Sequence, residues 1–463
     1  MQTLTYILAF IFILGSAVVL HEFGHFLVAK LLKIRVETFS VGFGPRLFGK
    51  KWGDTDYRVS AVPLGGYVKL GGDESNAPIE GEGVANIPER ERFDLRPRYQ
   101  RIMVALAGPI MNIITALSIP FIGAMMYGVP VSSAPIVSYV QQGGAAQTAG
   151  LQPGDHIVSF NGTENPTWEA ISGDALLSPE QPVAIVVNRA GQRVPLTITP
   201  SSINEGGDVI GSLDFVPDNG GYPVTLKVVV PDSPAAKAGL QVGDHVVAIK
   251  GDSVRSAEHV TKFIREHKHE PITLTVERNG TRQDVTASAA KLPDGTERLG
   301  FTPVDDYPLT KPTVGAAAGF AVRSNVEILR LTGKALGQVF VGKRSVRNTL
   351  SGPIGIYEAS ARSVERLGWG GLFQMMAILS LNLGIFNLLP IPVLDGGAIF
   401  ILLIEGALAP LGLSLSMRVR ERIQQVGFVA VLLLMVFVIS NDLLKKFTRA
   451  PDTQAPSSVS PGK

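Results

Sequence analysis

The chain has no cysteine among its 463 residues, and charged residues make up only 18% of it. The lack of cysteine excludes disulfide scaffolds, cysteine-ligated zinc, iron–sulfur clusters and thiol nucleophiles, so any metal site must use His, Asp or Glu. The net charge of +2 excludes a nucleic-acid binder that relies on overall basicity. Sparse charge, 45% hydrophobic residues and a mean hydropathy of +0.24 together indicate that part of the chain lies in lipid.

Four apolar runs are long enough to cross a bilayer, which takes about 20 helical residues. They cover residues 4–32, 102–127, 372–408 and 426–444. The first run lacks the basic start and the cleavage site of a signal peptide, so we expect it to be retained. Basic clusters flank the runs at 30–35, 90–101 and 418–422. The positive-inside rule places these clusters in the cytoplasm and both termini and residues 128–370 outside, although a basic cluster at 445–449 breaks the pattern.

The long segment between the second and third runs contains an internal repeat. The stretch that holds Gly150 and Asp155 returns, 89 residues later, as the stretch that holds Gly239 and Asp244. This spacing predicts one small domain per copy. The pattern resembles the A-G-L-x-x-G-D-x-I/V stretch of bacterial PDZ domains, which bind an extended peptide at a strand edge. Because His156 and His245 are equivalent in the two copies, we assign them to the fold rather than to a metal site.

The first apolar run carries an H-E-x-x-H motif, His21-Glu22-Phe23-Gly24-His25. Histidines at i and i+4 lie on one helix face about 6 Å apart, so both can reach one tetrahedral zinc ion. Glu22 would not bind the metal but would take a proton from the water that zinc activates and pass it to the leaving amine. A chance match is the alternative, but polar groups are costly in a lipid-embedded helix and are functional by default there.

A third zinc ligand must come from another span, because no third histidine follows the motif. Asp395 is our candidate, within the run N-L-L-P-I-P-V-L-D-G-G at 387–397. Its expected depth matches that of His21, and Pro390 and Pro392 break helical hydrogen bonding, which is tolerated only where backbone is buried in protein or lines a water-filled cavity. The alternative is an Asp-Gly turn that ends a helix at the membrane surface.

Taken together, these features resemble the site-2 protease family of intramembrane zinc metalloproteases, and the tandem PDZ insertion resembles its RseP-type branch, the regulators of sigma-E protease. The matching residues are the two motifs above, Gly108-Pro109-Ile110-Met111-Asn112 and Ser351-Gly352-Pro353-Ile354-Gly355. The resemblance implies one zinc ion per chain held by His21, His25 and Asp395, with Glu22 as the general base. It also implies that Asn387 contacts the substrate backbone; the alternative is that Asn387 caps a broken helix. We expect Asn112 to serve helix packing.

Further expectations concern where substrates bind. The resemblance implies that a membrane-associated sheet pairs with the substrate at Gly42-Phe43-Gly44; an ordinary hairpin that covers the site is the alternative. If the PDZ units are circularly permuted, their groove candidates are Ile210-Gly211 and Leu299-Gly300-Phe301. The grooves could read a fresh C-terminus, or the two domains could act as a size filter, which we favour.

The predicted fold class is a polytopic α-helical membrane protein with four transmembrane helices, two extracytoplasmic PDZ (α+β) domains and a small membrane-associated β-sheet. The predicted boundaries are 1–32 for the first span, 33–101 for the cytoplasmic loop with the sheet, 102–127 for the second span, 128–220 and 221–308 for the PDZ domains, 309–371 for a helical connector, 372–408 for the third span, 409–425 for a cytoplasmic loop, 426–446 for the fourth span and 447–463 for a disordered tail. Residues 79–88 are expected to be mobile.

The implied activity is hydrolysis within the transmembrane segments of single-span proteins that have already been trimmed on the outside. An anti-sigma factor of the sigma-E envelope stress response is the typical substrate of such a protease, and remnant signal peptides are a second class. The implied location is the bacterial inner membrane, with the active site near the cytoplasmic side and no nucleic-acid partner.

Two other classes stay open. A membrane protease with an exposed catalytic domain would need its own glutamate ligand, for which the loop offers Glu80, Glu82, Glu89 and Glu91. A PDZ-bearing adaptor or a metal carrier would bind through its histidines without catalysis. A Glu22→Gln change separates them, because only a protease loses its activity while it retains zinc.

Overall fold

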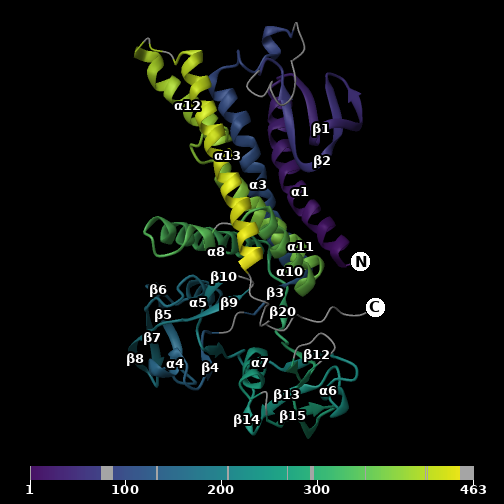
Figure 1. Cartoon of the computed structure of the whole chain (residues 1–463), viewed down its shortest axis with the longest axis vertical. Helices are drawn as coiled ribbons and strands as arrows, with labels where there is room; N and C mark the ends of the chain where they lie inside the picture. The colour runs from purple at the N-terminus through teal and green to yellow at the C-terminus, as the bar shows by residue number, and fades with distance from the viewer. Residues whose placement is uncertain are drawn as a thin grey trace. The chain divides into compact units, whose positions relative to one another are not determined.

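The computed structural model describes residues 2–73, 87–131, 134–205, 208–267, 270–291, 297–349, 351–411, 413 and 415–448 (Figure 1). Most of the segment that we expect to be mobile, and the tail from 449 on, lie outside these residues. The chain divides into two compact units. Unit 1 comprises Met1–Met126, Thr313–Leu329 and Leu350–Lys445, and unit 2 comprises Tyr127–Pro312, Arg330–Thr349 and Lys446–Lys463.

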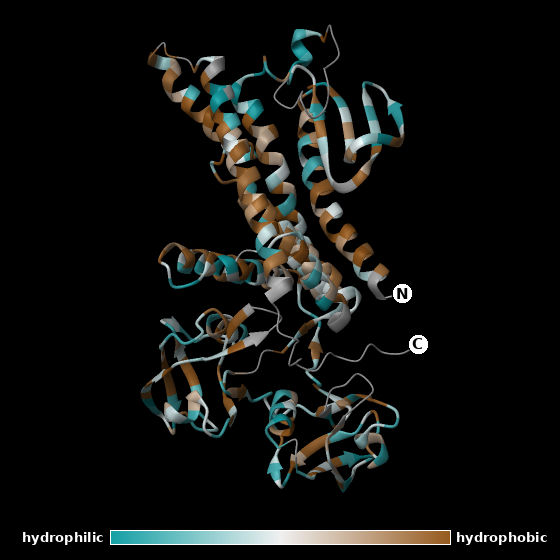
Figure 2. Ribbon diagram, in the orientation of Figure 1, coloured by the Kyte–Doolittle hydropathy of each residue, from teal (hydrophilic) through white to brown (hydrophobic). Residues whose placement is uncertain are grey.

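Among the described residues, four helices of unit 1 are long and apolar enough to cross a membrane. The candidate spans lie in α1 (Gln2–Leu31), α3 (Arg98–Tyr127), α11 (Trp369–Asn387) and α13 (Met417–Thr448). Hydrophobic residues cover these helices along most of their length in Figure 2. Many of their large apolar side chains stay exposed in the protein alone, as expected for surfaces that face lipid.

The third apolar run forms two helices rather than one. α11 ends at Asn387, and α12 (Asp395–Leu408) and the 3₁₀ turn η2 (Ala409–Leu411) follow after a break. The break contains both predicted prolines, and Val393 adopts a φ of 85°, which is rare for a β-branched residue. Among the described residues of this run, α11 alone is a candidate span, whereas the prediction placed the third span over 372–408.

A sheet follows α1, as predicted. It consists of β1 (Val36–Trp52) and β2 (Thr55–Leu70). Phe39 pairs with Val68 on one side and with Tyr57 on the other, so the first half of β1 lies between two parts of β2. A short 3₁₀ helix, η1 (Glu89–Glu91), precedes α3.

The first repeat of unit 2 consists of short strands and two helices. In order these are β4 (Val137–Val140), α4 (Ala145–Thr148), β5 (His156–Phe160), β6 (Thr163–Glu164), α5 (Trp168–Leu176), β7 (Val183–Arg189), β8 (Gln192–Ile198), β9 (Ser201–Glu205), β10 (Asp208–Ser212) and β11 (Phe215–Pro217). Its main sheet has the order β6-β5-β7-β8, and β9 pairs with β10 and β4 with β11. A core of aliphatic and aromatic residues around the fully buried Ile157 and Ile171 stabilises it.

The second repeat has the same element order. It contains β12 (Val224–Val229), α6 (Pro234–Lys237), β13 (His245–Ile249), β14 (Asp252–Ser253), α7 (Ala257–Glu266), β15 (Ile272–Arg278), β16 (Thr281–Ala287), β17 (Ala290–Lys291), β18 (Glu297–Arg298) and β19 (Phe301–Asp305). Its sheet runs β16-β15-β13-β12-β19. β3 (Val129–Pro130) pairs with β20 (Leu309–Thr310). The helices α8 (Val314–Phe340), α9 (Val346–Thr349) and α10 (Pro353–Leu367) form the predicted helical connector.

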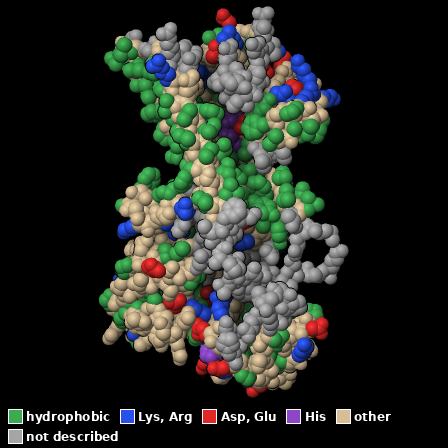
Figure 3. All heavy atoms as spheres, viewed as in Figure 1, with side chains coloured by type: hydrophobic (Ala, Val, Ile, Leu, Met, Phe, Trp, Pro, Cys, Tyr) green, Lys and Arg blue, Asp and Glu red, His purple; other side chains and the backbone are tan. Residues whose placement is uncertain are grey.

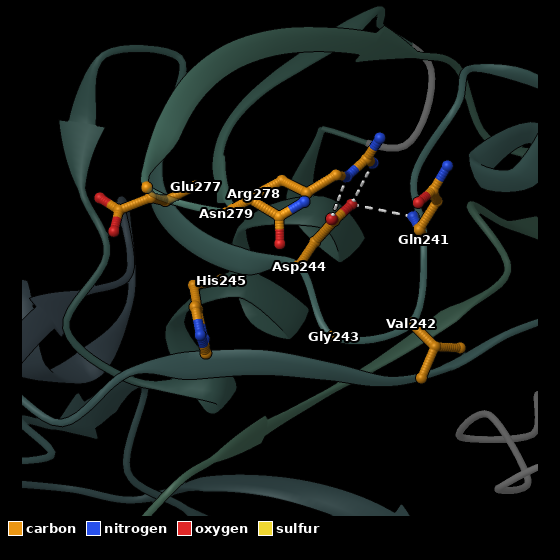
Figure 4. Close-up of a pocket in the computed structure, with 9 residues that line it drawn as sticks. Gln241, Val242, Gly243, Asp244, His245, Glu277, Arg278 and Asn279 are labelled. Atoms are coloured by element: carbon orange, nitrogen blue, oxygen red, sulfur yellow. Dashed lines mark hydrogen bonds and ion pairs between the residues drawn. The ribbon is translucent and has the colours of Figure 1, made fainter.

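The repeated Gly-Asp signature has the same structural role in both copies. In the second repeat Arg278 Nε donates to Asp244 Oδ1 at 2.6 Å (Figure 4). Arg278 Nη2 donates to the carbonyl oxygen of Gly239 at 2.8 Å. In the first repeat Arg189 makes the equivalent bonds to Asp155 and Gly150, both at 2.7 Å. Through its arginine partner, the aspartate therefore links the turn after the short helix to the end of a strand.

Candidate metal and peptidase site

The three predicted ligands come together in unit 1. His21 Nε2 lies 3.1 Å from Asp395 Oδ2, His25 Nε2 lies 3.5 Å from Asp395 Oδ1, and the two Nε2 atoms are 3.3 Å apart. One ligand atom from each residue falls within 4.8 Å of the others, and this is the one such cluster of His, Asp and Glu among the described residues. Figure 3 shows histidine and acidic side chains surrounded by hydrophobic ones in this unit.

The break between α11 and α12 positions Asp395 beside the two histidines. Asp395 is the first residue of α12, where exposed backbone N–H groups favour a carboxylate. The next two residues have to be glycine, because a Cβ on Gly396 would lie 2.3 Å from the carbonyl oxygen of Leu388 and one on Gly397 would lie 2.2 Å from that of Ile391. The Asp-Gly-Gly sequence thus lets the helix start tightly against the preceding loop.

α3 keeps His25 in the tautomer that can bind a metal. His25 Nδ1 donates to the carbonyl oxygen of Val104 at 2.7 Å, which leaves the Nε2 lone pair free. α1 and α3 approach closely because Gly24 packs on the backbone of Ala107, and a Cβ on Gly108 would lie 2.3 Å from His25 Nε2. Two imidazole nitrogens and one carboxylate oxygen are a donor set that suits zinc with an open position.

Glu22 lies next to the cluster on the side of β2. Its carboxylate accepts a hydrogen bond from the backbone N–H of Val68 and lies within electrostatic range of His21, His25 and Asp395. A Cβ on Gly66 would lie 3.4 Å from Glu22 Cγ, so the strand passes directly over this side chain. β2 therefore both covers and orients Glu22.

Asn387 reaches the cluster from the last residue of α11. Its amide nitrogen lies 3.2 Å from His21 Nε2. The side chain of Asn387 therefore points to the cluster.

The structure places Gly42, Phe43 and Gly44 where β1 leaves the middle of the sheet. Val41 still pairs on both sides, with Gly66 and Val59, whereas Phe43 pairs with Val62. Phe43 is 37% exposed and its ring stacks on that of Tyr67. Gly42 and Gly44 have φ values of 93° and 87°, which glycine adopts readily.

The two groove candidates of unit 2 differ. In the first repeat, a Cβ on Gly211 would lie 2.1 Å from the carbonyl oxygen of Ala175, so β10 packs directly on the end of α5. In the second repeat, Gly300 has a φ of 88° and Leu299 is 2% exposed, and Phe301 begins β19. β19 pairs with β12 and also contacts α7.

Asn112 and Ser380 form a polar pair that we expected only in part. Asn112 is fully buried, and its amide lies 3.2 Å from His21 Nδ1 rather than serving helix packing alone. Ser380 Oγ lies 3.3 Å from Asn112 Oδ1. A single asparagine in an apolar run was the sequence signal for the first residue, whereas a serine among aliphatic residues gave no signal for the second.

Comparison with known proteins identifies the family. The model of peptidase family M50 matches residues 9–434. RseP of Escherichia coli K12, the regulator of sigma-E protease, is 30% identical over 463 residues, with 94% of this chain and 97% of that protein covered. A Neisseria meningitidis protein, whose name proposes a zinc metalloprotease, is 33% identical over 466 residues, with 96% of this chain and 99% of that protein covered.

Among solved structures, the PDZ domain of the SdrC-like protein of Listeria monocytogenes is 25% identical, covers 18% of this chain and 88% of its own, and has a TM-score of 0.16. The family model and the relatives cover almost the whole chain, together with its candidate membrane spans. The chain therefore belongs to peptidase family M50, the site-2 protease family of metalloproteases.

Proposed function

We propose that this protein hydrolyses peptide bonds within transmembrane segments of other proteins, with one zinc ion held by His21, His25 and Asp395. The observation that carries the proposal is the convergence of these three side chains within 4.8 Å from α1 and the start of α12. Such a polar cluster beside a candidate membrane span is costly unless it serves a function. The donor set also agrees with the zinc metalloprotease names of the relatives.

Each protein group has a separate task in the reaction. Zinc bound at the cluster would polarise the scissile carbonyl and make a water molecule nucleophilic near neutral pH. Glu22 accepts the proton of the attacking water and delivers it to the leaving nitrogen as the C–N bond breaks, so that a carboxylate and an amine form. The bond from Val68 keeps Glu22 beside the cluster during both transfers.

The substrate helix has to unwind before it can react, because each of its carbonyl groups is engaged in an internal hydrogen bond. The Asn387 amide, 3.2 Å from His21, is placed to donate to a freed substrate carbonyl. The part of β1 from Gly42 to Gly44 is placed to offer a strand edge, because the residues before it already pair on both sides.

The proposed substrates are single-span proteins that have lost their outer domain, such as an anti-sigma factor, together with remnant signal peptides. The relative named a regulator of sigma-E protease supports this class. In the proposed orientation the basic clusters face the cytoplasm, and both termini and unit 2 lie outside.

The two repeats of unit 2 act in this proposal as PDZ domains that exclude bulky outer domains. The tight packing of Gly211 on Ala175 leaves no room for a peptide strand in the first groove at that point, which favours a size filter over a reader of C-termini.

The test is cleavage of a single-span reporter, with and without a folded outer domain, by the purified full chain in detergent. We expect the wild type to cut only the trimmed reporter and Glu22→Gln to cut neither, with one zinc ion in each protein. Glu89→Gln, in the exposed η1 turn, is the matched control and should behave like the wild type.

Two results would reject the proposal. A zinc-loaded Glu22→Gln protein that cuts as fast as the wild type would remove Glu22 from the mechanism. Loss of zinc in Glu89→Gln would favour the protease class whose glutamate ligand lies in the loop. If the intact reporter were cut as well as the trimmed one, only the size filter would fail.

A further inference from the structure

A chain of hydrogen-bonding groups links three helices of unit 1 behind His21. Asn112 of α3 is fully buried, and its side-chain amide lies 3.2 Å from His21 Nδ1. Ser380 of α11 is also fully buried, and its hydroxyl lies 3.1 Å from the backbone oxygen of Asn112 and 3.3 Å from Asn112 Oδ1. The chain therefore runs from the metal cluster on α1 through α3 to α11.

The position of the proton on His21 decides how this chain is arranged. His21 Nε2 faces Asp395 and His25, so it can bind a cation only with a free lone pair. The ring proton then lies on Nδ1, which has to donate a hydrogen bond. Asn112 Nδ2 is the atom 3.2 Å away, and because Asn112 can accept only through its oxygen, its amide has to be turned for Oδ1 to face His21.

An asparagine amide can turn by 180° and keep its shape, so its partners decide which end points where. With Asn112 Oδ1 on His21, the amide nitrogen points to Ser380 Oγ and donates to it. The hydroxyl of Ser380 has one hydrogen, which it donates to the backbone oxygen of Asn112. In this arrangement His21, Asn112 and Ser380 all have complementary partners in an apolar environment, where an unpaired polar group is costly.

The two histidines are thus oriented by different means. His25 donates to a backbone carbonyl, that of Val104, which no substitution of a side chain removes. At Nδ1, the nitrogen that does not face the cluster, His21 depends on one side chain, that of Asn112, which in turn depends on Ser380. His21 is therefore the ligand whose orientation a point mutation can release.

We propose that Asn112 is a positioning residue that fixes the tautomer and the ring angle of His21 for zinc, and that Ser380 fixes the orientation of the Asn112 amide. The inference rests on the proposed zinc site. It assigns the asparagine of the second apolar run to the metal centre rather than to helix packing. Loss of a hydrogen-bonding partner behind a ligating histidine typically weakens metal binding about 10–100-fold.

The experiment measures zinc affinity of the purified full chain in detergent, by competition with a chelator, and records the visible spectrum of the cobalt-substituted protein. Asn112→Leu keeps the size of the side chain but cannot accept a hydrogen bond. We expect its zinc dissociation constant to rise about 10–100-fold and its cobalt spectrum to change. Asn112→Asp keeps an acceptor for His21 and should bind zinc within about threefold of the wild type, a limit well below that 10-fold loss.

Asn325→Leu is the matched control. Asn325 is also a buried asparagine of unit 1, where it donates to the carbonyl oxygen of Ala116 in α3, but it is not part of the cluster. We expect its zinc affinity to equal that of the wild type even if its unfolding temperature falls. If Asn112→Leu does not fold, Ser380→Ala takes its place and should weaken zinc binding to a smaller extent, by about threefold or more, and change the cobalt spectrum.

The inference is overturned if folded Asn112→Leu, or Ser380→Ala in its place, binds zinc as the wild type does. It is equally overturned if Asn325→Leu weakens zinc binding as much as the cluster variants do, since the effect would then be one of packing. Failure of the proposed function would give a different result. In that case the wild type itself would bind no zinc at His21 and Asp395, or would cut no reporter.

Discussion

His21 Nε2 lies 3.1 Å from Asp395 Oδ2, although the two residues belong to α1 and α12, near opposite ends of the chain. The contact can form only when the helices of unit 1 are assembled. A metal ion that uses both residues therefore binds the folded unit and not the unfolded chain. Zinc binding and the stability of unit 1 should accordingly be coupled.

Removal of zinc should lower the unfolding temperature of unit 1. A ligand present at 1,000 times its dissociation constant adds about 4 kcal/mol to the free energy of unfolding, so the transition should shift by several degrees. The measurement is thermal unfolding of the full chain in detergent, with and without a chelator, followed by mass-spectrometric peptide protection in each unit. Protection in unit 2 is the internal control and should not change. An equal shift in both units would contradict the coupling.

Gly108→Ala should disturb the metal site directly. An added Cβ would lie 2.3 Å from His25 Nε2, so the ring or α3 has to move, and such overpacking costs about 1–3 kcal/mol. We expect weaker zinc binding, measured by chelator competition, and a corresponding loss of reporter cleavage. Gly123→Ala in the same helix has no atom within 4 Å of the new Cβ and should be silent. Normal zinc binding by Gly108→Ala would show that the helices can separate without harm to the site.

The loss of Arg278 should destabilise the second repeat strongly. Asp244 is buried with a side chain only 1% exposed, and removal of the partner of a buried charge costs about 3–5 kcal/mol. Arg278 itself is 26% exposed, so we expect Arg278→Ala to fall at the lower end of that range. Arg189→Ala should act likewise on the first repeat. Arg282→Ala, whose ion pair with Glu277 is largely exposed, should cost less than about 1 kcal/mol in the same unfolding measurement.

Burial alone would raise the pKa of Asp244, but the hydrogen bonds from Arg278 and from the backbone N–H of Gln241, together with the charges of Arg278 and His245, outweigh burial and hold this pKa below its ordinary value. The carboxylate therefore stabilises the fold above the pKa of an unfolded aspartate, and this contribution is lost as the pH falls through the folded pKa. In Arg278→Ala the pH dependence below about pH 4 should become weaker. An unchanged acid transition would mean that the pair does not control this titration.

Local patterns were sufficient to predict the two histidines and Glu22, because i and i+4 positions share a helix face whatever the rest of the fold does. Asp395 needed the further argument that a carboxylate at matching depth can reach them. The prolines indicated a break in the third run, but not that α11 ends at Asn387. The sheet and the repeat were predictable because strand alternation and an 89-residue self-match are local properties.

Contacts between helices were not predictable in the same way. The role of Gly108 depends on how closely α3 approaches His25, and that of Ser380 depends on which face α11 presents to Asn112. Neither of these helix–helix contacts produces a periodic pattern in a single sequence. The packing of Gly211 on Ala175 could not be predicted for the same reason, since an open groove and a strand packed directly on a helix can have the same glycine pattern.

The stability of unit 2 should fall as the pH drops below about 6.5, through His259. This ring is 4% exposed, stacks on Tyr139 of β4 with centroids 4.8 Å apart, and has an Nδ1 atom with no hydrogen-bond partner among the described residues. Burial lowers the pKa of His259, and the charge of Asp252 opposes this shift only in part. The folded protein therefore keeps the ring neutral at a pH where the unfolded chain already binds a proton.

Between the ordinary histidine pKa of about 6.5 and the lowered value, the free energy of unfolding should decrease by up to about 1.4 kcal/mol for each pH unit. His259→Phe keeps the stacking surface and removes the titrating group, so its unfolding temperature should depend less on pH between 7 and 5 than that of the wild type. The other histidines titrate in both proteins, so the difference between the two curves isolates His259. Parallel curves would mean that the ring is protonated as readily in the fold as in the unfolded chain, which its stacking on Tyr139 and its buried Nδ1 argue against.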